Sequence, residues 1–315
     1  MYDIVALGEL LVDFIQEGVN SDGHPVFSAN PGGAPCNMLA MASKLGKKTG
    51  FIGKVGKDSM GIMLRDVVMS CGIDVKGLCF DDRIPTTLAF VSKTANGDRD
   101  FSFYRNPGAD VMLSESDIDY EMISRAKVFH FGTLSMTHEM VRNATKCAIN
   151  YAKKQGCLIS FDPNIREPLW DCMDELRKQM AYGMEKCDIL KISDNEILWF
   201  TGEKDFDKAI EKLKAEYDIP LIFLTLGKDG SRAYYKEICS EHHGFVVENV
   251  VDTTGAGDTF MGTALSKVLD IGMENLNKEC LNEILIYANR AASMITLRKG
   301  ALSVMPEREE IELKK

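Results

Sequence analysis

Strand-length apolar segments alternate with longer, helix-like segments along most of this chain. The strand-like segments lie at residues 4–7, 51–55, 128–131, 158–161, 189–192 and 220–224, and the helix-like ones at 35–45, 60–70 and 140–154. Neighbouring parallel strands must be joined by a crossover, which is usually a helix, so this order is typical of βαβ units. The alternation predicts an α/β fold with a mostly parallel central sheet that is covered by helices.

Two segments interrupt this alternation, at about residues 11–31 and 85–107. The first is polar and contains an Asn-Ser-Asp-Gly turn sequence, and the second has two alternating segments around Asn96 and Gly97. An Asn-Gly pair tolerates the positive φ angles of a tight hairpin. We therefore expect a small β-sheet inserted into the α/β fold, as a lid or a subunit interface. Without an internal repeat or a low-complexity linker, residues 1–315 are predicted to form one domain.

The chain is acidic, with a formal net charge of -10 over 315 residues. Such a charge disfavours a nucleic-acid partner, and a phosphorylated ligand would need a local site made by backbone donors. No apolar segment approaches a membrane span and no basic n-region precedes the first strand, so we expect a cytoplasmic protein without a membrane partner. The nine cysteines lack a Cys-x-x-Cys pair and the histidines lack metal-ligand spacing, which argues against disulfides and structural zinc.

The segment 252–260 reads Asp-Thr-Thr-Gly-Ala-Gly-Asp-Thr-Phe and carries the clearest chemical signal. It opens a predicted helix on which Phe260, Ala264 and Val268 share one face. Two glycines at a helix N-terminus allow backbone N–H groups to point at an anion, and the helix dipole adds to the attraction. Asp258, in the first turn, would then lie beside the anion and accept a proton from a hydroxyl. The alternative is a tight turn in which Asp258 only caps the helix start.

A second glycine-rich segment, Asn-Pro-Gly-Gly-Ala-Pro-Cys-Asn at 30–37, precedes the first long predicted helix. By itself it is compatible with a simple helix boundary, in which Gly32 and Gly33 form a loop and Pro35 lies near the first helical position. Its functional interpretation therefore depends on the rest of the chain.

Together, the segments 252–260 and 30–37 resemble the two signatures of the ribokinase-like (PfkB-type) carbohydrate kinases. The segments 8–13 and 224–230 and the position of Asn289 resemble further motifs of the family, so the resemblance covers nearly the whole chain. It implies a ribokinase-like fold and the phosphorylation of a small sugar by ATP with Mg²⁺.

The resemblance also implies roles for individual positions. Asp258 would be the catalytic base, and the anion hole would consist of the backbone N–H groups of Gly255, Ala256 and Gly257. The sugar would be bound by Asp13, Gly32, Gly33, Asn37, Arg105 and Arg166. The nucleotide would be bound by Ser193, Thr225, Gly227, Gly230 and Asn289.

Two cation sites are implied as well. Glu196 would organise magnesium, although the family's Asn-x-x-Glu motif begins here with Ser193, so the role of that serine stays open. A monovalent cation, expected to be K⁺, would be bound by oxygens of Asp252, Thr254, Ile295, Arg298, Gly300 and Ser303, several of them backbone carbonyls.

Three segments resemble the fructokinases within the family, namely 103–110, 130–135 and 161–170. Arg105 would reach the sugar from the lid hairpin and Arg166 would lie near the cleft, although either could instead form a surface ion pair. These segments predict that D-fructose is phosphorylated on its 6-hydroxyl, giving fructose 6-phosphate. The Asp-Pro-Asn-x-Arg pattern also occurs in 2-keto-3-deoxygluconate kinases and aminoimidazole riboside kinase, which are alternatives, as is an inactive sugar-binding regulatory homologue. A homodimer formed through the lid is a further expectation.

Overall fold

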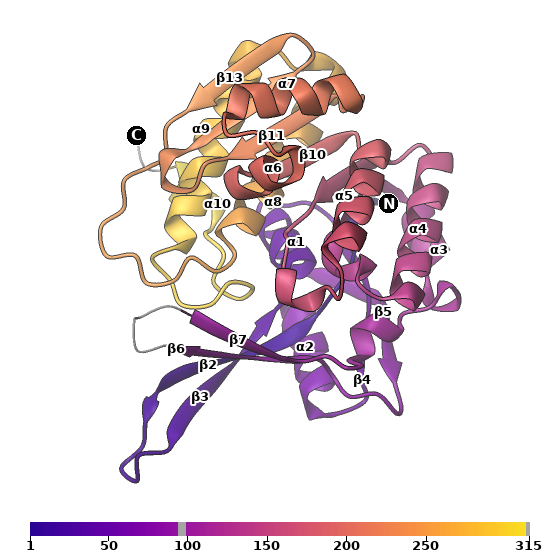
Figure 1. Ribbon diagram of the computed structural model, residues 1–315, viewed down its shortest axis with the longest axis vertical. Helices are drawn as coiled ribbons and strands as arrows, with labels where there is room; N and C mark the ends of the chain where they lie inside the picture. Colours follow the sequence, from indigo (N-terminus) through magenta and orange to yellow (C-terminus); the bar gives the residue numbers. More distant parts are fainter. Residues whose placement is uncertain (94–98, 313–315) are drawn as a thin grey trace.

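The computed structural model describes residues 1–93 and 99–312, and in this part of the chain nine strands form one central sheet (Figure 1). Its strand order is β13-β12-β11-β10-β9-β8-β1-β4-β5. The strands are β1 (Tyr2–Leu7), β4 (Thr49–Gly56), β5 (Ile73–Asp81), β8 (Ala126–Gly132), β9 (Leu158–Asp162), β10 (Ile189–Ser193), β11 (Leu221–Thr225), β12 (Ser231–Tyr235) and β13 (Ile238–His242). Neighbours from β11 to β5 are parallel, and β12 and β13 are antiparallel, which confirms the predicted α/β fold class.

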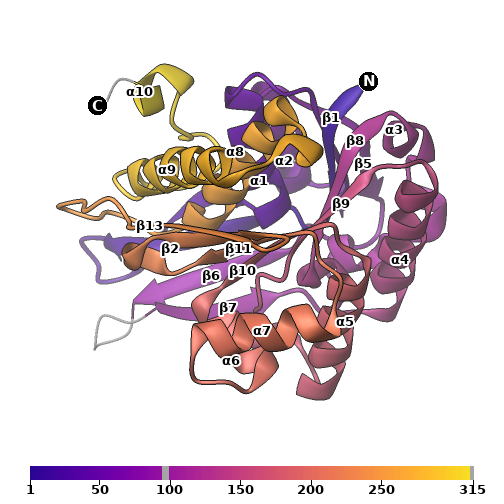
Figure 2. The ribbon, with the colours of Figure 1, turned by 90° about the horizontal axis from the view of Figure 1, so that it is seen from above.

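Helices cover both faces of this sheet, as Figure 2 shows. One face carries α1 (Ala34–Lys44), α2 (Ser59–Ser70), α8 (Ala256–Ile271) and α9 (Lys278–Ile295), with α10 (Arg308–Glu312) against α9. The other carries α3 (Tyr120–Ser124), α4 (Glu139–Lys154), α5 (Met173–Lys186), α6 (Asp194–Thr201) and α7 (Phe206–Glu216). No helix in the described ranges combines the length and the apolar character needed to cross a bilayer.

Strand β1 shows how the sequence produces two buried faces. Successive side chains of a strand point to opposite faces, so Ile4 and Ala6 belong to one core cluster while Val5 and Leu7 belong to the other. All four residues are 0% exposed. A strand that is buried on both faces reads as a continuous apolar run, which is why the segment 4–7 could be recognised in the sequence.

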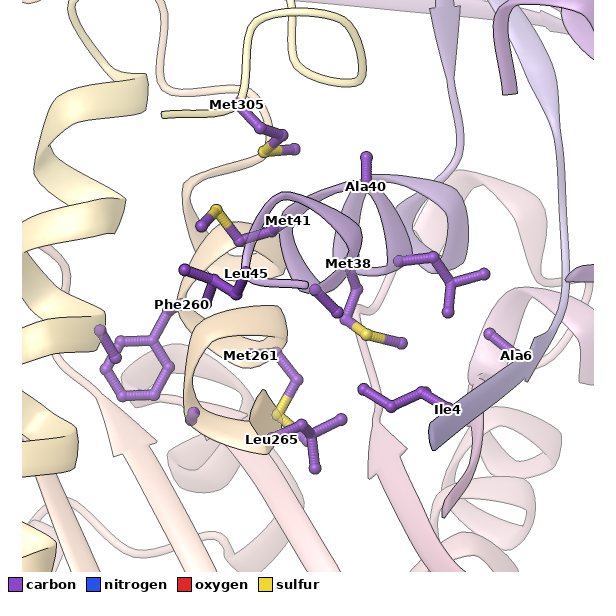
Figure 3. Packing of buried hydrophobic residues seen from close by; sticks show 14 of the residues in the cluster. Ile4, Ala6, Met38, Ala40, Met41, Leu45, Phe260, Met261, Leu265 and Met305 are labelled. Atoms are coloured by element: carbon purple, nitrogen blue, oxygen red, sulfur yellow. The ribbon is translucent and has the colours of Figure 1, made fainter. Parts of the chain in front are cut away.

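Helices α1 and α8 pack closely against each other in the first of these clusters (Figure 3). Met38 on α1 and Met261 and Leu265 on α8 are fully buried there. A Cβ atom on Gly262 would lie 2.4 Å from the backbone oxygen of Met38, so only glycine allows this close approach. The approach sets how the N-terminal residues of the two helices face each other.

A second sheet contains four strands in the order β3-β2-β6-β7, and it extends from the body in Figure 1. It is formed by β2 (Leu11–Val19), β3 (Pro25–Gly32), β6 (Leu88–Lys93) and β7 (Arg99–Tyr104). The pairs β2–β3 and β6–β7 are antiparallel, whereas β2 and β6 are parallel. Both interruptions of the sequence therefore contribute a hairpin, although Asn96 and Gly97 lie outside the described residues.

Candidate active site

A cavity of about 720 Å³ lies between the second sheet and the N-termini of α1 and α8. The second sheet contributes apolar and acidic residues, including Leu11, Asp13, Ile15, Val91 and Phe103. The body contributes the glycine-rich turns and charged groups, including Gly33, Asn37, Arg166, Lys191 and Asp258. The two glycine-rich signatures, more than 200 residues apart in the sequence, thus meet in one cavity.

The turn before α8 brings backbone donors to this cavity. Gly255 is the N-cap residue with φ 78°, in the left-handed region, and no side chain caps the helix. A Cβ atom on Gly255 would lie 2.6 Å from the Cβ of Ala301, and one on Gly257 would lie 3.1 Å from Nζ of Lys191. Glycine is therefore needed at position 255, and at position 257 it leaves room for the end of the Lys191 side chain. The N–H of Ala256 donates to the backbone oxygen of Thr253 at 3.3 Å, and no side chain caps this helix start beside the cavity.

Asp258 is held in the first turn of α8 by a residue of α1. Nδ2 of Asn37 donates a hydrogen bond of 2.8 Å to Oδ2 of Asp258. Burial raises the pKa of the Asp258 carboxyl, while the Asn37 hydrogen bond and the charges of Lys191 and Arg166 act in the opposite direction. The other amide atom, Oδ1 of Asn37, is buried and accepts no hydrogen bond within the described residues. A ligand hydroxyl that donates to it would satisfy this acceptor.

Lys191 is a charged site residue to which the sequence analysis gave no role. It lies in β10, is 6% exposed, and its Nζ is 3.0 Å from Oδ2 and 3.1 Å from Oδ1 of Asp162. Burial raises the pKa of Asp162 to about 7, although Lys191 lowers it. A lysine within the apolar strand segment 189–192 was the available signal, because lysine is almost never buried without a partner.

Glu196 links two segments of the site through its two carboxylate oxygens. Oε2 accepts the N–H of Ser193 at 2.9 Å and its Oγ–H at 2.7 Å, which forms a capping box at the start of α6. Oε1 accepts the N–H of Ile165 at 2.8 Å, in the loop that carries Arg166. Ser193 thus has a defined structural partner in Glu196, and its part in nucleotide binding stays a prediction.

The positions predicted to bind the nucleotide lie together, at the C-terminal ends of neighbouring strands. Ser193 pairs with Thr225 across β10 and β11, and Thr225 pairs with Ser231 in β12. Ser231 in turn donates a hydrogen bond of 3.0 Å to Oδ1 of Asn289 on α9. The predicted Gly227 and Gly230 flank the intervening turn with φ 56° and 104°. These positions do not line the cavity.

Four of the six residues predicted to bind the sugar line the cavity, namely Asp13, Gly33, Asn37 and Arg166. Burial raises the pKa of Asp13 to about 6, Arg166 lowers it and Asp252 raises it further. Gly32 leaves room for this carboxylate, because a Cβ atom at this position would lie 2.4 Å from Oδ2 of Asp13.

Arg105, which the sequence analysis expected to reach the sugar, does not line the cavity in this structure. Its guanidinium forms a buried ion pair with Asp110 at 2.6 Å and donates hydrogen bonds to the backbone oxygen of Leu134 at 2.9 Å and to Oγ1 of Thr137 at 3.0 Å. Arg105 is 4% exposed and does not line the cavity, whereas Leu134 does. A buried guanidinium needs acceptors, and Asp110, five residues away, supplies them. The ion pair with Asp110 is buried and not on the surface, and the contact of Arg105 with a sugar stays a prediction.

The residues predicted to bind a monovalent cation surround the turn before α8. Asp252 is central to this group: its Oδ1 accepts the N–H and the Oγ1–H of Thr254 at 2.9 and 2.7 Å, and its Oδ2 accepts the N–H of Gly300 at 3.4 Å. The guanidinium of Arg298 donates instead to the backbone oxygen of Val304. The remaining members, Ile295 at the end of α9 and the exposed Ser303, are close in sequence to Arg298. Their binding of a cation stays a prediction.

The fold and this cavity define a sugar kinase: the chain matches the pfkB family carbohydrate kinase model over residues 1–308 and belongs to that family. It is 39% identical over 305 residues to probable fructokinase-2 from Arabidopsis thaliana, covering 96% of this chain and 92% of that protein. The structure of a fructokinase from Xylella fastidiosa with bound ATP has a TM-score of 0.91 at 26% identity, over 99% of this chain and 98% of that one. A fructokinase from Vibrio cholerae, bound to fructose, ADP and calcium, has a TM-score of 0.88 at 28% identity, over 99% and 98%.

Proposed function

We propose that this sugar kinase transfers the γ-phosphoryl group of ATP to the 6-hydroxyl of D-fructose, giving fructose 6-phosphate. The observation that carries the proposal is the hydrogen bond between Asn37 and Asp258 at the N-terminus of α8. It puts a carboxylate, an unpaired amide oxygen and the donors of a helix N-terminus in one cavity. The Xylella and Vibrio fructokinases, with ATP in one case and with fructose and ADP in the other, support the choice of substrates.

The mechanism that we infer begins with the orientation of the sugar. Asp13 and Oδ1 of Asn37 accept hydrogen bonds from sugar hydroxyls, and Arg166 donates one. Asp258 then accepts the proton of the attacking hydroxyl. Because burial raises its pKa, Asp258 is a stronger base than an exposed aspartate, while Asn37 fixes the direction of its carboxylate.

Charge stabilisation at the transferred phosphoryl group is assigned to the start of α8 and to Lys191. Phosphoryl transfer is a loose reaction in which positioning and charge neutralisation contribute most of the catalysis. The first-turn N–H groups of residues 255–257 and the ammonium group beside Gly257 supply positive charge on one side of the cavity. The apolar side chains of Leu11, Val91 and Phe103, from the second sheet, exclude water that would otherwise accept the phosphoryl group. The second sheet thus acts as the lid of this site.

Glu196 is suited to organise Mg²⁺ through water. Its oxygens each accept protein hydrogen bonds, but a carboxylate oxygen has further lone pairs, and Mg²⁺ keeps several of its waters. Within residues 1–93 and 99–312, no group of three or more histidine, cysteine, aspartate or glutamate side chains could hold a metal. The ion would therefore depend on the ATP phosphates, whose charge it neutralises. The oxygen-rich surroundings of Asp252 are the corresponding proposal for K⁺.

The outer face of the lid supports the proposed homodimer. The ring of Phe90 stacks on Phe14 with centroids 4.9 Å apart and meets Phe27 at 5.4 Å and Tyr104 at 5.3 Å. Tyr104 is 66% exposed at the edge of this cluster. Clustered aromatic side chains on a surface are typical of an interface. We further propose that the enzyme works in the cytoplasm, where ATP and free sugars are available.

A phosphorylation screen tests the substrate assignment. Purified enzyme with ATP and Mg²⁺ is given D-fructose, 2-keto-3-deoxygluconate or aminoimidazole riboside, and kcat/KM is measured for each, with the product's phosphate position assigned by NMR. Fructose should be preferred and phosphorylated at position 6. A tenfold or greater preference for either rival, about 1.4 kcal/mol of transition-state binding, would overturn fructose but not the kinase assignment. Turnover of none would favour an inactive binding homologue.

A further inference from the structure

Glu9 is a buried carboxyl group in the wall of the active-site cavity, and the mechanism above gives it no role. It lies in the connection between β1 and β2, is 4% exposed, and lines the same cavity as Asp13, Asn37 and Asp258. Burying a carboxyl group costs free energy unless polar partners replace its hydration. Its partners therefore decide what it does.

The contact made by the Glu9 side chain explains only part of its position. Oε1 of Glu9 accepts the backbone N–H of Ala34 at 2.9 Å, the first residue of α1. The N-cap residue Gly33 has φ 131° and offers no side-chain cap, so Glu9 supplies the missing acceptor from another segment. A hydrogen bond from the backbone N–H of Glu9 itself also lowers the pKa of this carboxyl group. Two backbone donors still occupy only part of the lone pairs of a carboxylate.

Arg105 is the cation that acts on the pKa of Glu9, but it forms its ion pair with Asp110. Arg105 lowers the pKa of Glu9, but its guanidinium is bonded to Asp110, Leu134 and Thr137, and Asp110 raises the pKa again. Burial dominates and raises the pKa of Glu9 to about 7. Among the described residues, no lysine, arginine or histidine forms an ion pair with this carboxyl group. Its unused acceptor capacity is therefore available to a ligand in the cavity.

We propose that Glu9 is a sugar-contacting residue, with one oxygen capping α1 and the other accepting a hydrogen bond from a sugar hydroxyl that is not phosphorylated. The inference rests on the proposed function, because it takes this cavity as the sugar site. Glu9 then helps to determine specificity. A sugar that lacks the partner hydroxyl leaves a buried carboxyl group unpaired, and such losses discriminate strongly between substrates.

The test is the variant Glu9→Gln, combined with single-hydroxyl deletions in the substrate. Glutamine keeps an oxygen for the N–H of Ala34 and nearly the same volume, but its second position becomes a donor. The sugar KM should rise about 10- to 100-fold, as expected for losing a hydrogen bond to a charged group, while the KM for ATP and the thermal midpoint change little. One monodeoxy analogue of fructose should lose at least about tenfold in kcat/KM with wild-type enzyme but not with Glu9→Gln, because the partner is already missing.

Asp119→Asn is the matched control, since Asp119 caps α3 through the N–H of Met122 at 2.8 Å and does not line the cavity. It should leave both KM values unchanged. A sugar KM for Glu9→Gln within about twofold of wild type, with unchanged losses across the deoxy series, would make Glu9 a helix cap only and overturn the inference. If Glu9→Gln does not fold, Glu9→Asp must show the selective loss at one hydroxyl, and equal losses at all positions would overturn it. Wild-type enzyme that phosphorylates no sugar would instead defeat the proposed function, and the inference with it.

Discussion

At the scale of single residues, the site is built from carboxyl groups that burial makes hard to ionise. The pKa is raised to about 6 for Asp13 and to about 7 for Asp162 and Glu9, and it is also raised for Asp258. In each case desolvation is the largest cause. In the ligand-free enzyme these carboxyl groups are poorly solvated, and their ionisation costs stability. Sugar hydroxyls and phosphate-bound cations can compensate for the lost hydration, and such a loss of stability is common at functional sites.

Asp13→Asn should therefore stabilise the ligand-free protein at high pH while it weakens sugar binding. As the pH rises from about 4 to about 6, folded Asp13 keeps a proton that the unfolded chain loses, so wild-type stability falls over this window and stays lower above it. Asparagine has no such titration. The difference in thermal midpoint, variant minus wild type, should grow between about pH 4 and about pH 6 and stay constant from there to about pH 8. A constant difference would show that Asp13 ionises as easily folded as unfolded.

Where a local motif is present, sequence reasoning at this scale named residues that line one cavity, and it missed contacts that only the fold supplies. Asp258, Asn37 and Gly33 could be named because their glycine-rich segments resemble family signatures. Glu9 and Lys191 acquire their roles from Ala34 and Asp162, which are distant in sequence. For Arg105, nothing in a linear reading reveals that Asp110 and the turn after β8 enclose its guanidinium.

At the scale of elements, the helix starts are the functional parts of the fold. Strand β1 was predicted from its continuous apolar run, and helices α4 and α8 from their apolar periodicity, whereas α5 and α7 were not named. Apolar periodicity does not show which elements pack together. An example is the close approach of α1 to α8 at Gly262, which brings Asn37 within hydrogen-bond distance of Asp258. The coupling of α6 to the loop after β9 through Glu196 is of the same kind.

Glu196→Gln should weaken sugar binding even in the absence of nucleotide and Mg²⁺. Its Oε1 holds the N–H of Ile165, next to Arg166, and its Oε2 holds the start of α6, so losing one acceptor releases one of the two segments. Fructose affinity measured by calorimetry without ATP should fall severalfold, and the KM for ATP should rise as well. Asp205→Asn, which alters the cap of α7 at Lys208, is the matched control. Unchanged sugar affinity would assign Glu196 to the nucleotide side alone.

At the scale of the whole molecule, the second sheet completes the cavity and presents an aromatic outer face. Its inner residues wall the site, and Glu17 in β2 forms an ion pair with Lys299 in the loop after α9, so the sheet is attached to the body near the turn that precedes α8. The sequence predicted a small inserted β-sheet from two segments, but it did not predict how they pair. The parallel pairing of β2 with β6 joins residues about 75 positions apart, and no local pattern reveals such a contact.

If this face forms the proposed dimer, Tyr104→Arg should shift the enzyme toward monomers. Tyr104 lies on the exposed edge of the ring cluster around Phe90, and a charge there would be buried without a partner in the interface. Sedimentation velocity across a concentration series compares the variant with wild type. Lys57→Ala, which removes a fully exposed charge of the body, serves as the control and should leave the association unchanged. Monomeric wild-type enzyme at all concentrations would contradict the dimer.

The central claim, that the start of α8 is a phosphoryl-transfer site with Asp258 as its base, is tested most directly by the Asp258→Asn variant. The amide keeps the size of the side chain but cannot accept the proton of the sugar hydroxyl. With ATP, Mg²⁺ and fructose, we expect kcat to fall by about 10² to 10⁴ while the KM for ATP stays within about twofold and the variant remains folded. Near-normal turnover by a correctly folded Asp258→Asn enzyme would contradict the account.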